Sequence, residues 1–261
     1  DAWEYRLKLF AEWAEAAGID SVGSLQSYDV VEYYELRSAE VAPATLEGEM
    51  WTLKGFLEFL EDLGAVEKGL ADSVRIPDVD EEDRSSDTKL EQGRAEALLE
   101  YYRESAEAFG TRAHLFLELA WITGARMGGL RALDLRDIEW GSDPYVEFRH
   151  RPETGTPLKN KTGGERAVAL REETGAALEA YIFDHRYDVH DEHGRQPLLA
   201  STQGRPGPNT IRVWSYLATE PCLHSACPHG REREACEWTE YAHASKCPSS
   251  RSPHQIRTGA V

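Results

Sequence analysis

The sequence predicts a mainly α-helical protein with a small β-sheet, in which a helical domain precedes a mixed α+β domain. Apolar residues repeat at helical spacing through most of residues 1–75. A polar segment, 76–88, then separates this region from one in which helical patterns alternate with short strand-like runs. With 261 residues and 41% hydrophobic content, the chain can bury one or two cores.

The first region contains three expected helices. Residues 3–17 form an amphipathic helix, and a second helix follows Ser27 or Asp29 as its N-cap. The third ends at Gly64 and has the clearest pattern. Its apolar face consists of Leu46, Met50, Leu53, Leu57 and Leu60, and that of the first helix of Trp3, Leu7, Phe10, Ala14 and Ala17.

The segment IPDVDEEDRSSDT has the composition of a solvated linker, so we place the domain boundary there, giving domains 1–83 and 84–261. In the second domain we expect helices near 90–106, 112–123 and 172–186. Candidate strands are Tyr145–Arg149 and Arg166–Leu170, joined by the loop or hairpin turn TGTPLKNKTGGE.

The formal net charge of −18 is concentrated at one end of the chain. Residues 1–83 carry 21 acidic and 6 basic side chains, whereas residues 84–261 carry 26 and 23. We interpret the acidity, with only 7 Lys among 29 cations, as adaptation to concentrated salt. Composition alone would favour the alternative, an ordinary acidic enzyme without a nucleic-acid partner.

No apolar run approaches the roughly 20 residues that span a bilayer, and the first residues do not resemble a signal peptide, so we expect a cytoplasmic protein without a membrane partner. The chain begins with Asp rather than Met, and its last residues run into the opening of an expected helix. We therefore expect a sequence clipped at both ends.

Three segments carry candidate chemistry. TGARMGGLRALDLRDI places Arg126 at a glycine-punctuated helix junction, and LKNKTGGERAVAL places Lys161 before a strand. In PHQIR, His254 and Arg257 share one face of a helix that begins after Ser252-Pro253. Taken singly, each has an ordinary explanation: a surface cation beside a helix C-cap at Gly124, a solvated lysine, and a chance H-x-x-R.

In this order and at these separations, the three segments resemble box I, the β-hairpin lysine and box II of the tyrosine recombinase (phage integrase) superfamily. The preceding helical region is similar to the core-binding (SAM-like) domain of that family, so the resemblance covers essentially the whole chain. It implies a clamp of two domains around double-stranded DNA. Relatives act as homo-tetramers on paired DNA sites.

By this resemblance Arg126 and Arg257 hold the scissile phosphate, Lys161 is the general acid toward the 5′-oxygen, and His254 assists proton transfer. Lys159 is the less favoured substitute for Lys161. No cofactor is expected for catalysis. Gly129 stands where box I usually has an acidic residue, which would weaken the hydrogen-bond support of Arg126.

The family's nucleophile is a tyrosine downstream of box II, which forms a 3′-phosphotyrosyl intermediate. None of the eleven tyrosines lies beyond Arg257, four residues before the end. We therefore nominate no nucleophile and expect the polypeptide as written to bind DNA without cleaving it.

All four cysteines, Cys222, Cys227, Cys236 and Cys247, fall in one segment with the spacing C-x4-C-x8-C-x10-C. We expect a Cys-rich insert, 220–250, closed by a structural Zn²⁺, in which His224, His229 or His243 could replace a thiolate. Free or disulfide-paired cysteines are the alternative. The insert resembles those just before box II in integrases from salt-loving archaea.

Two other functional hypotheses stay open beside the recombinase. The chain could be a non-catalytic truncated DNA-binding protein that occupies recombination sites. It could also be a zinc-stabilised protein-interaction module in which the three motifs are coincidental, as its acidity would favour. The last hypothesis predicts no DNA binding at any salt concentration, whereas the first two predict salt-dependent binding.

Overall fold

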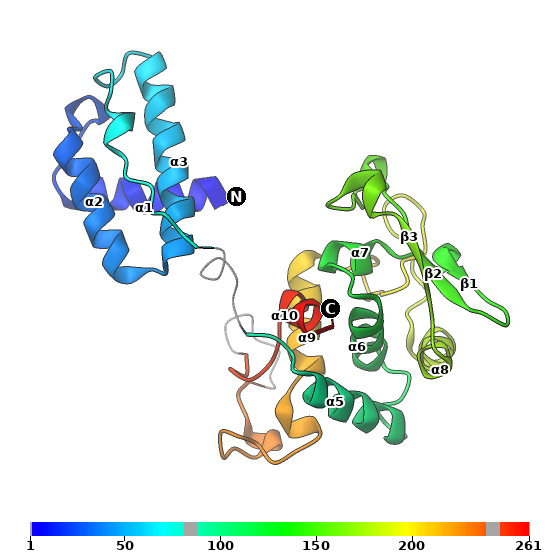
Figure 1. The fold of residues 1–261 in the computed structure, drawn as a ribbon. Coiled ribbons are helices and arrows are strands. Elements are labelled where there is room, and N and C mark those ends of the chain that lie inside the picture. Colours follow the sequence, from blue (N-terminus) through cyan, green and yellow to red (C-terminus); the bar gives the residue numbers. More distant parts are fainter. Residues whose placement is uncertain (1, 81–87, 239–245, 261) are drawn as a thin grey trace. The chain divides into compact units, whose positions relative to one another are not determined.

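The computed structural model describes residues 2–80, 88–238 and 246–260 (Figure 1). These divide into two compact units, residues 1–87 and 88–261. The boundary expected after residue 83 falls in the segment 81–87, outside the described residues. None of the described helices combines the length and hydrophobicity that a bilayer crossing requires.

The first unit is helical, with α1 at Ala2–Ala16, α2 at Ser27–Glu40 and α3 at Pro43–Asp62. Every apolar residue expected on the inner face of the third helix is buried, which confirms the four-three pattern. Gly64 takes a positive φ of 68° just after α3, as expected of a residue ending a helix. One buried carboxylate, Glu49, accepts two hydrogen bonds from the Arg37 guanidinium, at 2.8 and 2.9 Å.

Two expectations for this unit were wrong in detail. The second helix begins one residue earlier than predicted, because Gln26 occupies the N-cap position and its backbone N–H donates to the Asp29 carboxylate. Trp3, expected on the buried face of the first helix, is 54% exposed. Trp13 instead reaches the core and packs 5.1 Å from Tyr33, ring centroid to ring centroid.

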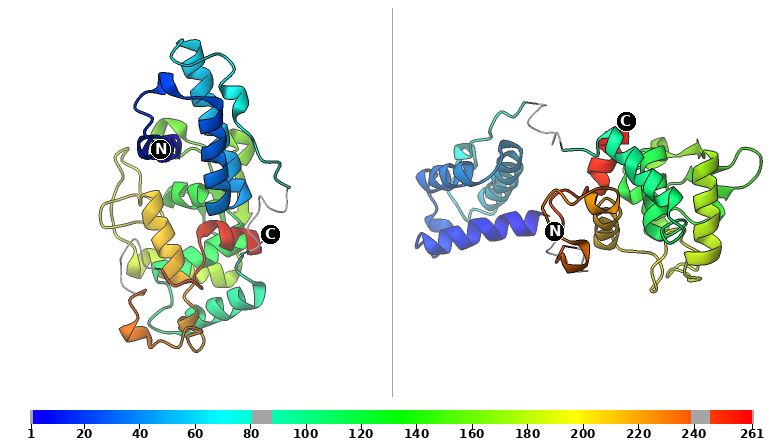
Figure 2. Two further views of the ribbon diagram at one scale, coloured as in Figure 1. Left: turned by 90° about the vertical axis from the view of Figure 1, so that its left-hand side faces the viewer. Right: turned by 90° about the horizontal axis from the view of Figure 1, so that it is seen from below.

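The second unit is built around α6, Arg112–Thr123, whose bounds are those predicted. This helix contacts α5 (Gln92–Glu104), α8 (Glu172–Ala180), α9 (Pro208–Ala218) and α10 (Pro253–Ala260). Apolar side chains all round it are buried, which is why its sequence is almost uninterruptedly hydrophobic. Figure 2 shows α10, in red, beside α6 and α9.

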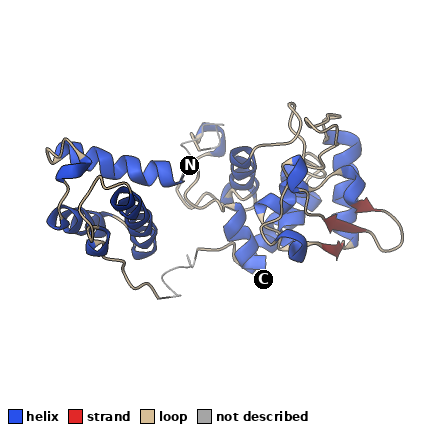
Figure 3. Cartoon of the chain, turned by 90° about the horizontal axis from the view of Figure 1, so that it is seen from above, coloured by secondary structure: helices blue, strands red, loops and turns tan. Residues whose placement is uncertain are grey.

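A three-stranded antiparallel sheet with the order β1-β2-β3 completes this unit. The strands are Ile138–Glu139, Tyr145–Phe148 and Arg166–Ala169, drawn in red in Figure 3. In β2 and β3 the register pairs Val146 with Val168 and Phe148 with Arg166. Val146 and Phe148 are buried, so β2 presents alternate residues to the core.

Candidate functional site

Arg126 is presented by a sharp turn between two helices. Helix α6 ends at Thr123, and Gly124 follows in the left-handed region with φ 55° and ψ 23°. Arg126 is then the exposed N-cap residue of α7, Met127–Ala132. Since glycine tolerates positive φ at little steric cost, the TGAR sequence reverses the chain within three residues.

Gly129 stands where box I usually has an acidic residue, and it lies on the buried side of α7. A Cβ added there would stand 3.4 Å from the Phe148 ring. The first turn of α7 contains no acidic residue. The helix therefore packs directly onto β2 and offers no carboxylate to Arg126.

Helix α10 presents His254 and Arg257. Its N-terminus is a capping box, because the backbone N–H of Ser252 donates to Gln255 Oε1 at 2.9 Å and the backbone N–H of Gln255 donates to Ser252 Oγ at 3.4 Å. This confirms the helix start expected from Ser252-Pro253. Ile256 is fully buried in the core of the unit, whereas Arg257 is half-buried and His254 is exposed.

Lys161 lies in the connection between β2 and β3 and has a positive φ of 52°. No other non-glycine residue among those described has a positive φ. Such a conformation strains an L-residue unless surrounding structure imposes it, and such strain is concentrated at functional positions. Lys159 and Lys161 are both exposed, and neither ammonium is paired within the described residues.

The two arginines meet around a third that the motifs did not single out. Partial burial lowers the pKa of Arg166, and the positive charges of Arg126 and Arg257 lower it further. Because such charge effects fade beyond about 10 Å at 0.1 M salt, the three guanidiniums share one neighbourhood. The clue in the sequence was the charged pair Glu165-Arg166 at the start of an expected strand.

In the part of the chain that the structure describes, no hydrogen bond or ion pair engages the guanidinium of Arg126 or Arg257. Other arginines of the second unit are engaged: Arg151, Arg195 and Arg205 all bind Asp134. Two free cations close to a third form a site that attracts a multiply charged oxyanion. No such contact joins Lys161 or His254 to these arginines within the same residues.

No family model matches the chain. The tyrosine recombinase XerC of Roseiflexus castenholzii (strain DSM 13941 / HLO8) is 25% identical over 197 residues, which cover 71% of this chain and 61% of that protein. The chain thus spans about three fifths of the length of this curated relative.

Two solved structures share the fold. The Tn1549 transposon integrase in complex with transposon right end DNA is 15% identical, with a TM-score of 0.64 over 98% of this chain and 78% of that one. Lambda integrase bound to DNA is 14% identical, with a TM-score of 0.57 over 99% of this chain and 76% of that one.

The chain is thus similar in sequence to a tyrosine recombinase and shares the fold of solved integrases. That fold, with a helical domain before a mixed domain that holds a small sheet, is the one the sequence predicted. The roles of Arg126, Lys161, His254 and Arg257 stay predictions for this chain.

None of the four cysteines of segment 220–250 is in a disulfide, and Cys236 and Cys247 are buried. Outside 239–245, where His243 lies undescribed, no three metal-ligating side chains come together. His229 Nε2 is 3.0 Å from Ser249 Oγ. The zinc ligand set of Cys222, Cys227, Cys236 and Cys247 therefore stays a prediction.

Several buried polar atoms gather in and beside this segment without a hydrogen-bond partner among the described residues. They are Arg94 Nε, Glu220 Oε2, His224 Nε2 and Ser250 Oγ. Glu220 Oε2 faces the Arg233 guanidinium at 3.2 Å, but without hydrogen-bond geometry. Since buried polar atoms nearly always have a hydrogen-bond partner, the described residues of this segment leave an unusual number of them unsatisfied.

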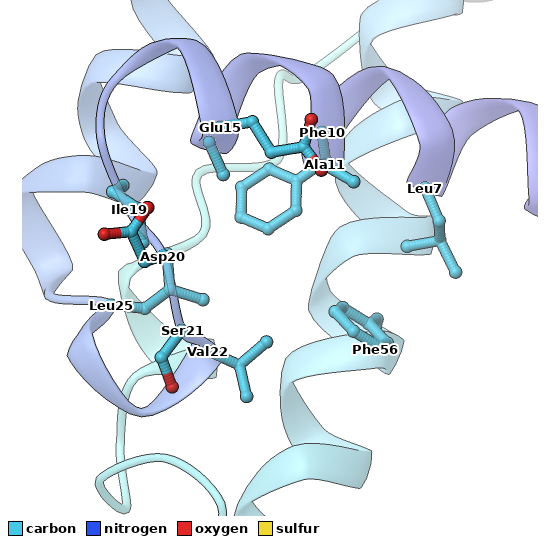
Figure 4. A pocket seen from close by; sticks show the side chains of 11 residues that line it. Leu7, Phe10, Ala11, Glu15, Ile19, Asp20, Ser21, Val22, Leu25 and Phe56 are labelled. Carbon is cyan, nitrogen blue, oxygen red and sulfur yellow. The ribbon is translucent and has the colours of Figure 1, made fainter.

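The first unit contains a cavity of about 600 Å³ between α1 and α3, shown in Figure 4. Leu7, Phe10, Val22 and Phe56 are among its lining side chains. The lining includes no basic residue. The cavity therefore lacks the groups that a nucleic-acid phosphate needs, and the arginine cluster remains the candidate site.

Proposed function

We propose that the arginine pair Arg126–Arg257 binds a backbone phosphate of double-stranded DNA, as the strand-cleavage centre of a site-specific recombinase or integrase. The supporting observation is that two guanidiniums with no hydrogen bond or ion pair among the described residues lie near Arg166, and that neither α7 nor β3 contributes a carboxylate there. A phosphodiester carries the complementary charge and offers oxygens to a bidentate guanidinium.

In the proposed reaction, a tyrosine hydroxyl attacks the phosphorus and forms a 3′-phosphotyrosyl bond while the bond to the 5′-oxygen breaks. Arg126 and Arg257 stabilise the negative charge that grows on the non-bridging oxygens. Lys161 gives a proton to the departing 5′-oxygen, and His254 assists the proton transfer. We assign no tyrosine of residues 1–261 to the nucleophilic role.

Binding of a short DNA duplex, followed by fluorescence anisotropy during a salt titration, tests this proposal. We expect Arg126→Ala and Arg257→Ala each to weaken binding by roughly tenfold and to lower the salt slope by about one, because each removes one phosphate contact. Arg231→Ala is the matched control, since that guanidinium is already paired with Glu237 at 2.8 Å. Unchanged affinity in both site variants would contradict the phosphate role.

Binding without cleavage is the expected result for residues 1–261 and agrees equally with the second candidate, a protein that occupies recombination sites without cutting them. A covalent protein–DNA adduct on a nicked suicide duplex would exclude the second candidate, because only cleavage forms that adduct. Absence of DNA binding at every salt concentration would favour the protein-interaction module. We propose that the active form assembles as a tetramer on paired sites. The mass of the protein–DNA complex would then increase when two duplexes are joined.

We further propose that segment 220–250 binds a structural Zn²⁺. The buried atoms beside it that lack a hydrogen-bond partner among the described residues support this proposal. Burial, and after it the charge of Glu220, raises the pKa of the Cys222 thiol, and a bound cation would offset both effects. The described side chains do not form a preassembled site. Metal binding would have to gather them, as is usual where metal and folding are coupled.

Metal analysis of the purified protein tests the zinc proposal. We expect about one equivalent of zinc, lost in Cys236→Ser and kept in Ser225→Ala, a neighbouring exposed residue that offers no thiolate. Less than a tenth of an equivalent in the unaltered protein after dialysis against zinc would contradict it.

A further inference from the structure

Arg166 begins strand β3 at the point where the strand is paired with Phe148 of β2. Its guanidinium carbon lies 4.5 Å from the centroid of the Phe148 ring. That ring is itself 1% exposed and packed in the core of the unit. A cation stacked on an immobile aromatic face has few alternative positions, so the core fixes where this guanidinium lies.

The same guanidinium reaches back to the turn that presents Arg126. Its Nη2 donates to the carbonyl oxygen of Thr123 at 3.2 Å, across 43 residues of sequence. Thr123 is the last residue of α6, where carbonyl groups have no partner within the helix. Its Nη1 lies 3.4 Å from the carbonyl oxygen of Gly164, close to Lys161 in the hairpin connection. Arg166 thus links the box I turn to the β2–β3 connection.

Placing this cation here is electrostatically unfavourable in the free protein. The neighbouring Arg126 and Arg257 are also positive, and no acidic residue occurs in α7, in β3 or in α10. The nearest carboxylate in sequence, Glu165, accepts a hydrogen bond from the backbone N–H of His150. The stacking on Phe148 and the hydrogen bond to Thr123 therefore hold a third guanidinium near two others, and no carboxylate of α7, β3 or α10 offsets their charge.

We propose that Arg166 is a positioning residue of the phosphate site: it fixes the Thr123–Arg126 turn against β3 so that the Arg126 guanidinium meets the phosphate. This inference rests on the proposed function. Arg166 donates to the carbonyl oxygens of Gly164 and Thr123, and Thr123 belongs to the turn that presents Arg126, so Arg166 acts on the phosphate through Arg126. Preorganisation of this kind raises affinity because the Arg126 side chain and its turn lose less conformational entropy on binding.

A double-mutant cycle with a short DNA duplex tests the inference. Arg166→Met keeps an unbranched chain over Phe148 but removes the charge and the donors, whereas Arg166→Lys keeps the charge and one donor for the Thr123 carbonyl. We expect Arg166→Met to weaken binding by roughly tenfold in the unaltered protein but less than about twofold in the Arg126→Ala background. Arg166→Lys should remain within about threefold of the unaltered protein.

Equal losses from Arg166→Met in both backgrounds would overturn the inference, because they would indicate a phosphate contact independent of Arg126. Equal losses in Arg166→Met and Arg166→Lys would also overturn it, since packing alone would then explain them. Thermal unfolding and circular dichroism identify any variant that fails to fold. If Arg126→Ala weakens binding while Arg166→Met does not, this inference fails and the proposed function stands; if neither weakens it, the proposed function fails as well.

Discussion

Lys161 occupies a backbone conformation that its own side chain disfavours. A positive φ brings Cβ close to the backbone in any residue except glycine, at about 1–2 kcal/mol. Lys161 is exposed, and its ammonium forms no ion pair among the described residues that would offset this strain. A strained backbone without such a contact favours a functional role for the lysine side chain.

We therefore expect Lys161→Gly to raise the free energy of unfolding slightly, by less than about 1 kcal/mol, because glycine adopts a positive φ without steric strain. Lys161→Val should lower stability by about 1 kcal/mol or more, because a β-branched residue tolerates positive φ poorly. Urea unfolding measures both. Lys159→Gly is the control. If the Lys161→Gly protein were less stable than the Lys159→Gly protein, the backbone at Lys161 would not be strained.

At the scale of single residues, the sequence located Arg126 and Arg257 because their motifs are local. Arg166 was missed for a physical reason. Its importance depends on the register that sets it opposite Phe148 and on a hydrogen bond to a residue 43 positions away. Neither the pairing of two strands nor their register follows from the strands' own residues when one of them, β3, is exposed along most of its length.

Helix α10 depends on a close backbone approach at Gly259. A Cβ added there would collide with the carbonyl oxygen of Leu90 and lie 3.2 Å from the Trp121 ring. The backbone N–H of Leu90 also donates to the carbonyl of Gln255 at 2.9 Å. The element that carries His254 and Arg257 is thus fixed to the start of the second unit by a contact that only glycine permits.

We expect Gly259→Ala to lower the free energy of unfolding by about 2 kcal/mol and to weaken DNA binding, because α10 must shift to relieve the collision. Gly93→Ala is the matched control: Gly93 lies in helix α5 with no atom near an added Cβ, so alanine there should stabilise by about 0.5–1 kcal/mol. Thermal unfolding compares the two. Equal effects would mean that the Leu90 contact is not what fixes α10.

A buried ion network supports the base of the β2–β3 connection. Asp134 and Asp191 are at most 6% exposed at the side chain and bind Arg195 and Arg205. Burial would by itself raise the pKa of Asp191. Hydrogen bonds from the backbone N–H and guanidinium of Arg195 and from Arg205 outweigh it, so this pKa lies well below its ordinary value.

Because the pKa of Asp191 is lower in the folded state, its contribution to stability is present above pH 4 and is lost as the pH falls toward the folded-state value. We expect the Asp191→Asn protein to be less stable than the unaltered protein by about 3 kcal/mol at pH 7. That difference should shrink between pH 4 and pH 2.5. Urea unfolding across this range measures it, and a constant difference would argue against the ionised carboxylate.

Among the elements, the sequence predicted best those whose packing is uniform. Helix α6 was located to the residue because all its faces are buried and Thr111 and Gly124 mark its ends. Helix α9 was not predicted, since it starts at Pro208 directly after a Gly- and Pro-rich run typical of loops. Strand β1 has two residues and no pattern of its own; its pairing with β2 defines it.

For the whole molecule, acidity and DNA binding are compatible because the charges are distributed unevenly. The first unit carries most of the excess negative charge. In the second unit, the buried carboxylates Asp134 and Glu118 pair with other arginines, whereas Arg126 and Arg257 form no ion pair among the described residues. Net charge alone would favour a protein without a nucleic-acid partner, so composition could not decide between that interpretation and the proposed function.

The excess acidity of the first unit should make the stability of the protein depend on salt. Helix α3 ends in Glu61-Asp62 with no basic residue in its last turn, so the exposed Asp62 faces the negative end of the helix dipole. Glu58 stands one turn before Asp62 with the same charge. Both interactions are unfavourable in dilute buffer and are screened when the Debye length falls to about 3 Å at 1 M salt.

We expect the melting temperature of the unaltered protein to rise between 0.1 M and 2 M KCl as this repulsion is screened. Asp62→Asn should stabilise the protein by about 0.5 kcal/mol in 0.1 M KCl and by almost nothing in 2 M KCl. Glu12→Gln is the opposite control, because Glu12 is paired with Lys8 at 3.5 Å and its loss should not stabilise at either salt concentration. An advantage of Asp62→Asn that persists in 2 M KCl would reflect local helix propensity, and the acidic surface would then not be the source of salt dependence.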